Sequence, residues 1–229
     1  MCTDGSTPFT TPAAAAPPRR ASAPGVFVLG LVGPAGAGKS TVARALAADG
    51  ARVLDGDRLG HELADRDPGV RAALVAEYGP HVYRADGMLD RKLVAASVFS
   101  DPAALARLNQ LMHPRILARL RDGIAQAVHE HFEGVLVIDA ALLLDWSFER
   151  ECDAVLAVLA PPEQQIARLV ATRGWTAEEV RQRLANARSH ESFAALADEV
   201  VINDGAEADA ILQARTAVAR LRARRGASS

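Results

Sequence analysis

A glycine-rich segment early in the chain has the residue types and spacing needed to hold a phosphate group. Residues 33–41 read GPAGAGKST and match the pattern G-x-x-x-x-G-K-[ST]. Glycines let consecutive backbone N–H groups curl around a phosphate, and the helix expected next adds the partial positive charge of its N-terminus. In this pattern Lys39 reaches the β- and γ-phosphates, and the Ser40 hydroxyl is a ligand for Mg²⁺. The segment predicts a nucleoside triphosphate site formed by Gly36, Ala37, Gly38, Lys39, Ser40 and Thr41.

An aspartate that follows an apolar run is a candidate ligand for the same ion. Val135–Ile138 predicts a buried strand, and Asp139 comes directly after it, as is typical of the aspartate near Mg²⁺ in such proteins. Four apolar residues followed by an aspartate are common by chance. The pattern indicates a Mg²⁺ ligand because a phosphate-binding segment occurs in the same chain. The alternative is that Asp139 caps a helix over residues 140–144.

Two further carboxylates, Asp55 and Asp57, follow the short apolar run Arg52–Leu54. Ligands gather at the carboxyl ends of strands in open α/β sheets, and residues two apart on an extended backbone point to one side. A carboxylate beside the γ-phosphate accepts the proton of an attacking hydroxyl or orients that hydroxyl in line. The pair is therefore a candidate for general-base chemistry, and the alternative for each residue is a helix cap.

A buried parallel sheet is the element that would hold these residues in place. Short apolar runs predict its strands, and helical patterns between them favour a parallel sheet wrapped by helices. The runs are Val26–Val32, Arg52–Leu54, Val135–Ile138, Ala154–Leu159 and Glu199–Ile202. The sequence thus predicts an α/β fold with a five-stranded parallel sheet.

The second and third predicted strands are about eighty residues apart, far more than one crossover helix requires. Within the interval we expect the helices Arg58–Asp65, Gly69–Tyr78, Asp90–Phe99, Asp101–Met112 and Pro114–His131. We interpret residues 58–132 as a helical acceptor domain, and residues 25–57 and 133–229 as the nucleotide-binding core. A lid is expected near residues 173–195, where Gly174 ends one helix and Thr176 and Glu179 have capping-box spacing for the next.

Composition excludes several classes of protein. The formal net charge of −2 argues against a broad nucleic-acid surface, and no apolar run approaches the roughly 18 residues of a membrane-spanning helix. Two cysteines in 229 residues rule out a disulfide framework, which fits a cytoplasmic protein. The Pro-, Ala- and Ser-rich residues 1–24 are predicted to be disordered. We expect small-molecule partners, no nucleic acid, no membrane and a monomer, with an oligomer left open.

Taken in order, the motifs resemble those of the dephospho-coenzyme A kinases. The resemblance covers nearly everything from Val28 to Gly205 and consists of GPAGAGKST, LDGDRLGHEL, RADGMLDRKLVAASVFSD, LNQLMHPRI, VIDAALLLD, RGWTAEEVRQRLANARS and ADEVVINDG. It implies a P-loop kinase core with a helical CoA domain and a lid. It also implies transfer of the γ-phosphate of ATP, used with Mg²⁺, to the ribose 3′-hydroxyl of dephospho-CoA, the last step of CoA synthesis.

The resemblance assigns roles in the acceptor site. Asp55 and Asp57 match the two aspartates of the family's D-A-D motif, and Asp57 is the implied base. Arg91 matches the arginine of a D-G-x-L-x-R segment, and its basic side chain is suited to the CoA phosphates. His113 matches the histidine of an L-H-P motif, and an equally good alternative is a polar helix start. His61 stands where many members have arginine, and we include it among the acceptor-binding residues.

The resemblance also concerns the lid and the last strand. Arg168 and Arg173 lie on the helix that enters the lid, where guanidinium groups stabilise charge on the transferring phosphoryl group. The implied catalytic residues are therefore Asp57, Lys39 and Arg173. Asn203 matches the loop that follows the last strand and faces the adenine of ATP.

Two other functions stay open at this stage. A P-loop kinase of another small acceptor, such as a nucleoside or nucleotide, would share Lys39, Ser40 and the lid arginines but need a smaller pocket. A degenerate paralogue would bind the nucleotide without turnover. A GTPase is disfavoured because no N-K-x-D motif occurs. Spacing alone does not distinguish ATP from other triphosphates.

Overall fold

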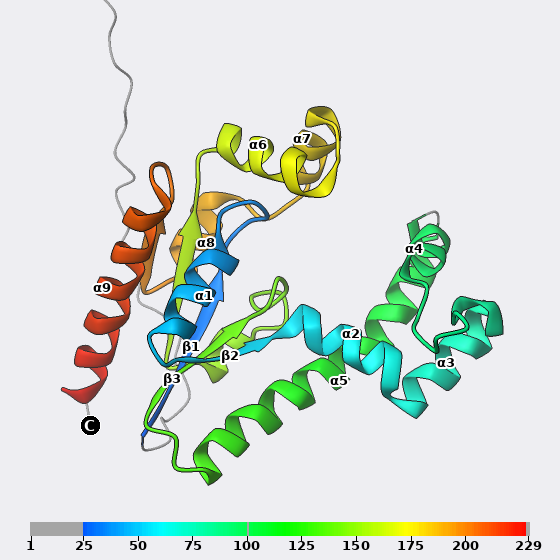
Figure 1. The fold of residues 1–229 in the computed structure, drawn as a ribbon, viewed down its shortest axis with the longest axis horizontal. Coiled ribbons are helices and arrows are strands. Elements are labelled where there is room, and N and C mark those ends of the chain that lie inside the picture. The colour runs from blue at the N-terminus through cyan, green and yellow to red at the C-terminus, as the bar shows by residue number, and fades with distance from the viewer. Residues whose placement is uncertain (1–24, 100, 228–229) are drawn as a thin grey trace, which may run out of the picture.

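A five-stranded, all-parallel sheet forms the centre of the larger part of the molecule (Figure 1). The computed structural model describes residues 25–99 and 101–227, so the predicted disorder of residues 1–24 lies outside the described residues. The strands run in the order β2-β3-β1-β4-β5. Their bounds are β1 Val26–Val32, β2 Arg52–Asp55, β3 Gly134–Asp139, β4 Ala154–Leu159 and β5 Glu199–Ile202. The predicted α/β fold and its five strands are confirmed.

The register of the strands brings the candidate chemistry to one edge of the sheet. Asp55, the last residue of β2, pairs with Asp139, the last residue of β3. Asp139 also pairs with Leu31 of β1, one residue before that strand ends. Because parallel strands end at the same edge, both aspartates lie beside the loop that leaves β1.

Helices cover both faces of the sheet. On one face, α1 (Lys39–Ala48) and α9 (Glu207–Gly226) pack their apolar residues on β1, β3 and β4. On the other face, the second half of α5 (Pro102–His129) and α8 (His190–Leu196) do the same. The strands β1 and β4 are buried along their whole length, as their continuous apolar runs predict, whereas the edge strand β2 is only half-buried.

The predicted helical insert is a separate layer beside the sheet (Figure 1). It contains α2 (Gly56–Arg66), α3 (Pro68–Tyr78), the 3₁₀ turn η1 (Pro80–Val82), α4 (Arg91–Phe99) and the first half of α5. The insert has its own small core, made of Ala64, Val70, Leu74, Val82, Leu89 and Val94. This core fixes the insert helices relative to one another, independently of the sheet.

The predicted break between Met112 and Pro114 is wrong, because α5 runs without interruption from Pro102 to His129. A proline inside a helix removes one hydrogen bond and costs about 3 kcal/mol. Tertiary packing outweighs that local cost, since the helix joins the two cores. Its second half buries four residues against the sheet: Ile116, Leu120, Ile124 and Ala127.

The segment predicted as a lid lies above the carboxyl edge of the sheet, on the same side as the insert (Figure 1). It begins at the end of α6 (Pro162–Arg173) and continues through α7 (Ala177–Ala185) into α8. Gly174 ends α6 with a φ of 67°, and Thr176 and Glu179 form the predicted capping box. None of the helices in the described part of the chain has the length and apolarity required to span a bilayer.

Candidate active site

The loop between β1 and α1 has the backbone shape expected of a phosphate cradle. Gly36 and Gly38 have φ angles of 76° and 103°, which side-chain-bearing residues rarely adopt. A Cβ on Gly36 would lie 2.9 Å from the backbone oxygen of Gln165, and a Cβ on Gly38 would overlap Asn203. Lys39 lies across the loop, where its Nζ donates to the Gly33 carbonyl at 2.7 Å. Ser40 and Thr41 follow in the first turn of α1.

Two side chains donate hydrogen bonds to the backbone carbonyls of this loop. The buried Asn203 follows β5, and its Nδ2 donates to the Ala37 carbonyl at 2.8 Å. Arg168 of α6 donates to Asn203 Oδ1 at 3.2 Å and to the Gly36 carbonyl at 3.3 Å. Both side chains are therefore engaged with the loop itself. The expected contacts of Asn203 with adenine and of Arg168 with the transferring phosphoryl group stay predictions.

The charges beside the loop influence one another. Burial lowers the pKa of Lys39, and the carboxylates of Asp139 and Asp57 oppose this effect. Burial likewise raises the pKa of Asp139 to about 6; Lys39 opposes that rise, while Asp55 and Asp57 add to it. One lysine thus faces an excess of negative charge at the edge of the sheet.

The expectation that Asp55 and Asp57 share an extended backbone is wrong. The strand ends at Asp55, and α2 begins at Gly56, so Asp57 lies in the first turn of that helix. Asp55 caps the helix, because its Oδ1 accepts a hydrogen bond from the Arg58 N–H at 2.9 Å. The helix-cap alternative is therefore correct for Asp55, whereas Asp57 stays exposed. The chain over residues 141–147 forms turns, so the helix that Asp139 would cap is absent there.

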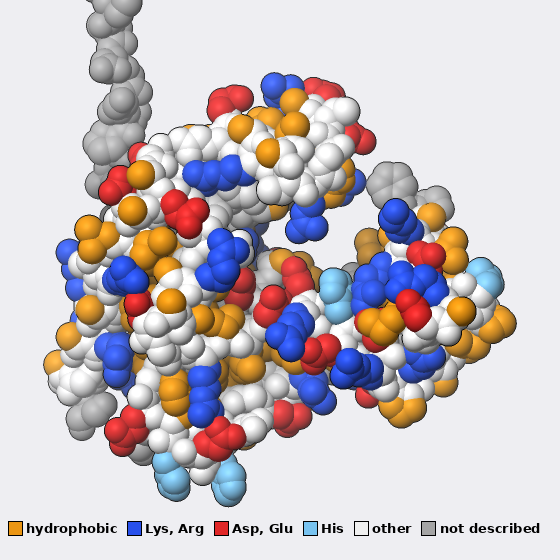
Figure 2. All heavy atoms as spheres, viewed as in Figure 1, with side chains coloured by type: hydrophobic (Ala, Val, Ile, Leu, Met, Phe, Trp, Pro, Cys, Tyr) orange, Lys and Arg blue, Asp and Glu red, His pale blue; other side chains and the backbone are white. Residues whose placement is uncertain are grey.

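A cavity of about 500 Å³ lies between the core, the insert and the lid. Figure 2 shows the hollow on one face, with Lys or Arg side chains on both of its sides and acidic side chains near its base. Five of the predicted site residues line the cavity: Asp57, His61, Arg91, His113 and Arg173. Asp55 does not line it. Residues from α2, α4, α5 and α6 thus meet around one space.

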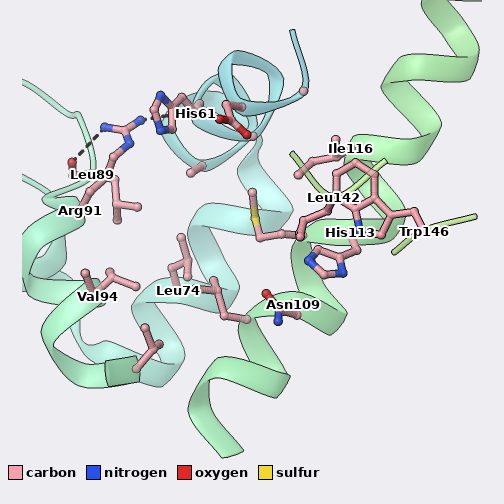
Figure 3. Close-up of a pocket in the computed structure, with 18 of the residues that line it drawn as sticks. His61, Leu74, Leu89, Arg91, Val94, Asn109, His113, Ile116, Leu142 and Trp146 are labelled. Atoms are coloured by element: carbon pink, nitrogen blue, oxygen red, sulfur yellow. Dashed lines mark hydrogen bonds between the residues drawn. The ribbon is translucent and has the colours of Figure 1, made fainter. Parts of the chain in front are cut away.

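Arg91 is held at one end of the cavity by a residue that sequence reasoning missed. The Arg91 guanidinium donates to Asp65 Oδ2 at 2.6 Å. It also donates to the His61 carbonyl at 3.3 Å (Figure 3). Asp65 is buried, and its Oδ1 accepts from the Leu89 N–H at 2.9 Å. Burial alone would raise the pKa of Asp65, but these hydrogen bonds and the charge of Arg91 leave it below the ordinary value.

The opposite end of the cavity is aromatic. His113 and Trp146 lie next to each other there, beside Leu142 and Ile116 (Figure 3). Their ring centroids are 5.3 Å apart and their planes make an angle of 65°. Burial lowers the pKa of His113, although the carboxylate of Asp145 acts in the opposite direction. His113 lies in the middle of α5, so the alternative that it starts a helix is wrong.

The residues at the carboxyl edge fit a magnesium ion. Hydroxyl and carboxylate oxygens are its usual ligands, and it needs only one or two protein carboxylates when phosphates supply the rest. Ser40 offers the hydroxyl, and Asp139 offers a carboxylate at the end of β3, where burial and the neighbouring Asp55 and Asp57 raise its pKa. Within residues 25–99 and 101–227, no group of three His, Cys, Asp or Glu side chains forms a metal site of its own.

Comparisons with known proteins decide the family. A family model described as dephospho-CoA kinase matches residues 27–209. This chain belongs to the dephospho-CoA kinase family. A dephospho-CoA kinase of Thermobifida fusca is 40% identical over 190 residues, which cover 82% of this chain and 92% of that protein. One of Streptomyces avermitilis is 40% identical over 177 residues, which cover 77% and 84%.

Solved structures agree with the fold of the family. The Thermus thermophilus protein TT1252 superposes with a TM-score of 0.70 at 29% identity, covering 85% of this chain and 96% of that one. A dephospho-CoA kinase from Campylobacter jejuni gives 0.61 at 17% identity, covering 86% and 97%. At that lower identity the likeness shows the shared fold of the family.

Proposed function

We propose that this protein transfers the γ-phosphate of ATP to the ribose 3′-hydroxyl of dephospho-CoA. The observation that carries the proposal is the cavity: it brings together Asp57 at the start of α2, Arg173 at the end of α6 and Arg91 of the insert. The same Asp57 acts electrostatically on Lys39 of the phosphate loop. Donor and acceptor sites therefore share one carboxylate, as a kinase requires, and the family membership of the chain supports this acceptor.

Each residue has a role that follows from its position. The amides of Gly36, Ala37 and Gly38, with Lys39, hold the triphosphate at the N-terminus of α1. Asp57 accepts the proton of the 3′-hydroxyl or orients that hydroxyl in line with the γ-phosphate. Arg173 at the end of α6 stabilises the charge of the phosphoryl group in transit.

Ser40 and Asp139 are the residues that would hold Mg²⁺, which shields the negative charge of the triphosphate when it is bound. Asp55 contributes indirectly, because it caps α2 and so fixes the turn that carries Asp57. His61 and Arg91 supply cationic or polar groups at the end of the cavity suited to the acceptor's phosphates, and His113 lines the other end.

The competing function, phosphorylation of a nucleoside or nucleotide, fits the cavity less well. Several apolar residues of the insert extend the cavity beyond the polar groups: Leu74, Leu89, Val94, Val98, Leu108 and Met112. A nucleoside has no part that would cover this surface, whereas dephospho-CoA carries a long arm. The size of the lined space therefore favours the bulkier acceptor.

A coupled assay of ADP formation tests the proposal. We expect ADP release from Mg·ATP to depend on dephospho-CoA and not on added nucleosides. Lys39→Ala should lower the rate by about 10²–10³-fold, because a preorganised charge on the phosphates is lost. Unchanged activity in that variant, or ADP release without any acceptor, would contradict the proposal.

A further inference from the structure

The aromatic end of the cavity contains a hydrogen-bond donor that none of the roles above employs. The indole Nε1 of Trp146 is shielded from solvent and has no hydrogen-bond partner among the described residues. An indole N–H only donates, and a buried one normally has an acceptor. Trp146 lines the cavity, so a bound molecule that displaces the groups covering Nε1 is the natural source of that acceptor.

His113 complements this donor. Its ring lies edge to face with Trp146, at 5.3 Å between centroids, and it lines the same cavity. Burial lowers the pKa of His113, so the imidazole is neutral near pH 7 and offers one ring nitrogen as an acceptor. Together the two rings present one donor and one acceptor between apolar neighbours, Leu142 and Ile116 (Figure 3).

The other parts of the cavity suit other parts of the acceptor, so the aromatic end is the one that suits its nucleobase. Arg91 and His61 lie at the opposite end, where charge suits phosphate groups (Figure 3). The adenine of dephospho-CoA is joined directly to the ribose whose hydroxyl reacts. Because Asp57 must meet that hydroxyl, the adenine must lie in the same cavity as Asp57. Of the cavity-lining residues in the described chain, only Trp146, His113 and His61 carry aromatic rings.

We propose that Trp146 and His113 form the subsite for the purine base of the acceptor. Trp146 Nε1 donates to a ring nitrogen of adenine, and the neutral imidazole of His113 accepts from the exocyclic amino group. This assignment rests on the proposed function and adds the determinant of base specificity. Hypoxanthine has an oxygen in place of the amino group and keeps the second hydrogen bond only when the imidazole changes tautomer, so the subsite favours adenine.

A fluorescence titration tests the contact directly, because Trp146 and Trp175 are the two tryptophans of the sequence. Trp175 lies in the lid, where it packs with Ile166, Leu169 and Val180, and does not line the cavity. The Trp175→Phe protein therefore reports on Trp146 alone. With a non-hydrolysable ATP analogue present, we expect dephospho-CoA to shift or quench the emission and 4′-phosphopantetheine, which lacks the adenosine, to leave it unchanged.

Kinetics test the same contact independently. Trp146→Phe keeps an aromatic ring but loses the N–H, so the KM for dephospho-CoA should rise about ten-fold, with kcat and the KM for ATP nearly constant. Trp175→Phe is the matched control and should change none of the three. The wild type should prefer dephospho-CoA to its hypoxanthine analogue by about ten-fold in kcat/KM, and His113→Phe should remove that preference.

The outcomes separate this inference from the function on which it rests. If the wild type neither binds dephospho-CoA nor phosphorylates it, both fail. If it turns over dephospho-CoA but the Trp146 emission does not respond, or responds equally to 4′-phosphopantetheine, only the subsite assignment is overturned. An unchanged KM in Trp146→Phe would overturn it as well.

Discussion

At the scale of single residues, the account depends on what Asp57 does. It lies in the first turn of α2, exposed to the cavity, while its neighbour Asp55 is occupied as the helix cap. Asp57→Asn keeps the shape and loses the basic oxygen, so kcat should fall by about 10²–10⁴-fold. The affinity for Mg·ATP, measured by calorimetry, should hardly change, because Lys39 and the loop amides hold the phosphates.

Two rival roles of Asp57 give different results in the same experiment. If Asp57 mainly positions Mg²⁺, the variant should bind Mg·ATP weakly and recover part of its rate at high Mg²⁺. If Asp57 only stabilises the start of the helix, asparagine stabilises it equally well, and both kcat and the melting temperature stay at the wild-type values. A near-native kcat therefore contradicts the general-base role.

At the same scale, the buried Asp65 ties the insert to its cavity-facing arginine. Asp65→Asn removes the charge that accepts from Arg91 and should destabilise the protein by about 1–3 kcal/mol, measured by denaturant unfolding. Asp49→Asn is the matched control, since Asp49 pairs with Arg215 on the surface and should cost about 0–1 kcal/mol.

The effect of Asp65 should depend on pH with a definite sign. Its folded-state pKa lies below the ordinary 3.8, so its contribution is complete above about pH 5 and disappears as the pH falls through the lower folded value. The stability difference between wild type and Asp65→Asn should thus be constant between about pH 5 and 7 and shrink below about pH 4. A difference that grows on acidification would contradict this assignment.

At the scale of elements, the Gln165 side chain links α6 to the end of β4 and to α8 of the lid. Its buried Nε2 donates to the Ala160 carbonyl at 2.6 Å and to His190 Nε2 of α8 at 2.7 Å. Gln165→Leu leaves both acceptors unpaired and should destabilise by about 1–3 kcal/mol for each group that stays buried. Thermal unfolding measures the loss, and a melting temperature equal to that of the wild type would refute the link.

The exposed Gln182 of α7 provides the matched control for that substitution. Gln182→Leu changes the same atoms on the surface and should leave stability within about 0.5 kcal/mol of the wild type.

Elements with local signals could be predicted from the sequence, and those decided by distant packing could not. Gly174 and the Thr176–Glu179 capping box end one helix and start the next as expected, because their effects act within one turn. The break expected at Pro114 fails because α5 is held by the sheet at one end and by the insert at the other. Local cost alone does not reveal such packing.

In the candidate site too, residues with a local sequence signal could be predicted, and residues placed by distant contacts could not. The phosphate loop is a contiguous segment, so its residues are readable from spacing alone. Asp65 meets Arg91 across 26 positions, and Trp146 meets His113 from a stretch of turns after β3. An aspartate in a helical pattern and an isolated tryptophan carry no local signal of these partners. Arg91 and His113, at the two ends of the cavity, were therefore predicted from the sequence, but their partners Asp65 and Trp146 were not.

At the scale of the whole molecule, ligand binding should draw core, insert and lid together. Because the cavity is lined by all three, dephospho-CoA should stabilise the folded protein. At 100 times its dissociation constant, a ligand adds about 2.7 kcal/mol, which raises the melting temperature by roughly 5–10 °C for a chain of this size. Adenosine or thymidine should give a smaller shift; an equal shift would favour the nucleoside kinase alternative.

The position of the transferred phosphate tests the central claim most directly. We suggest incubating the full-length protein with Mg·ATP and dephospho-CoA and examining the product by ³¹P NMR coupled to proton detection. The account predicts one new phosphomonoester whose phosphorus couples to the ribose H3′ proton, formed in equal amount to ADP. Coupling to another ribose proton, or ADP and inorganic phosphate with dephospho-CoA unchanged, would contradict it.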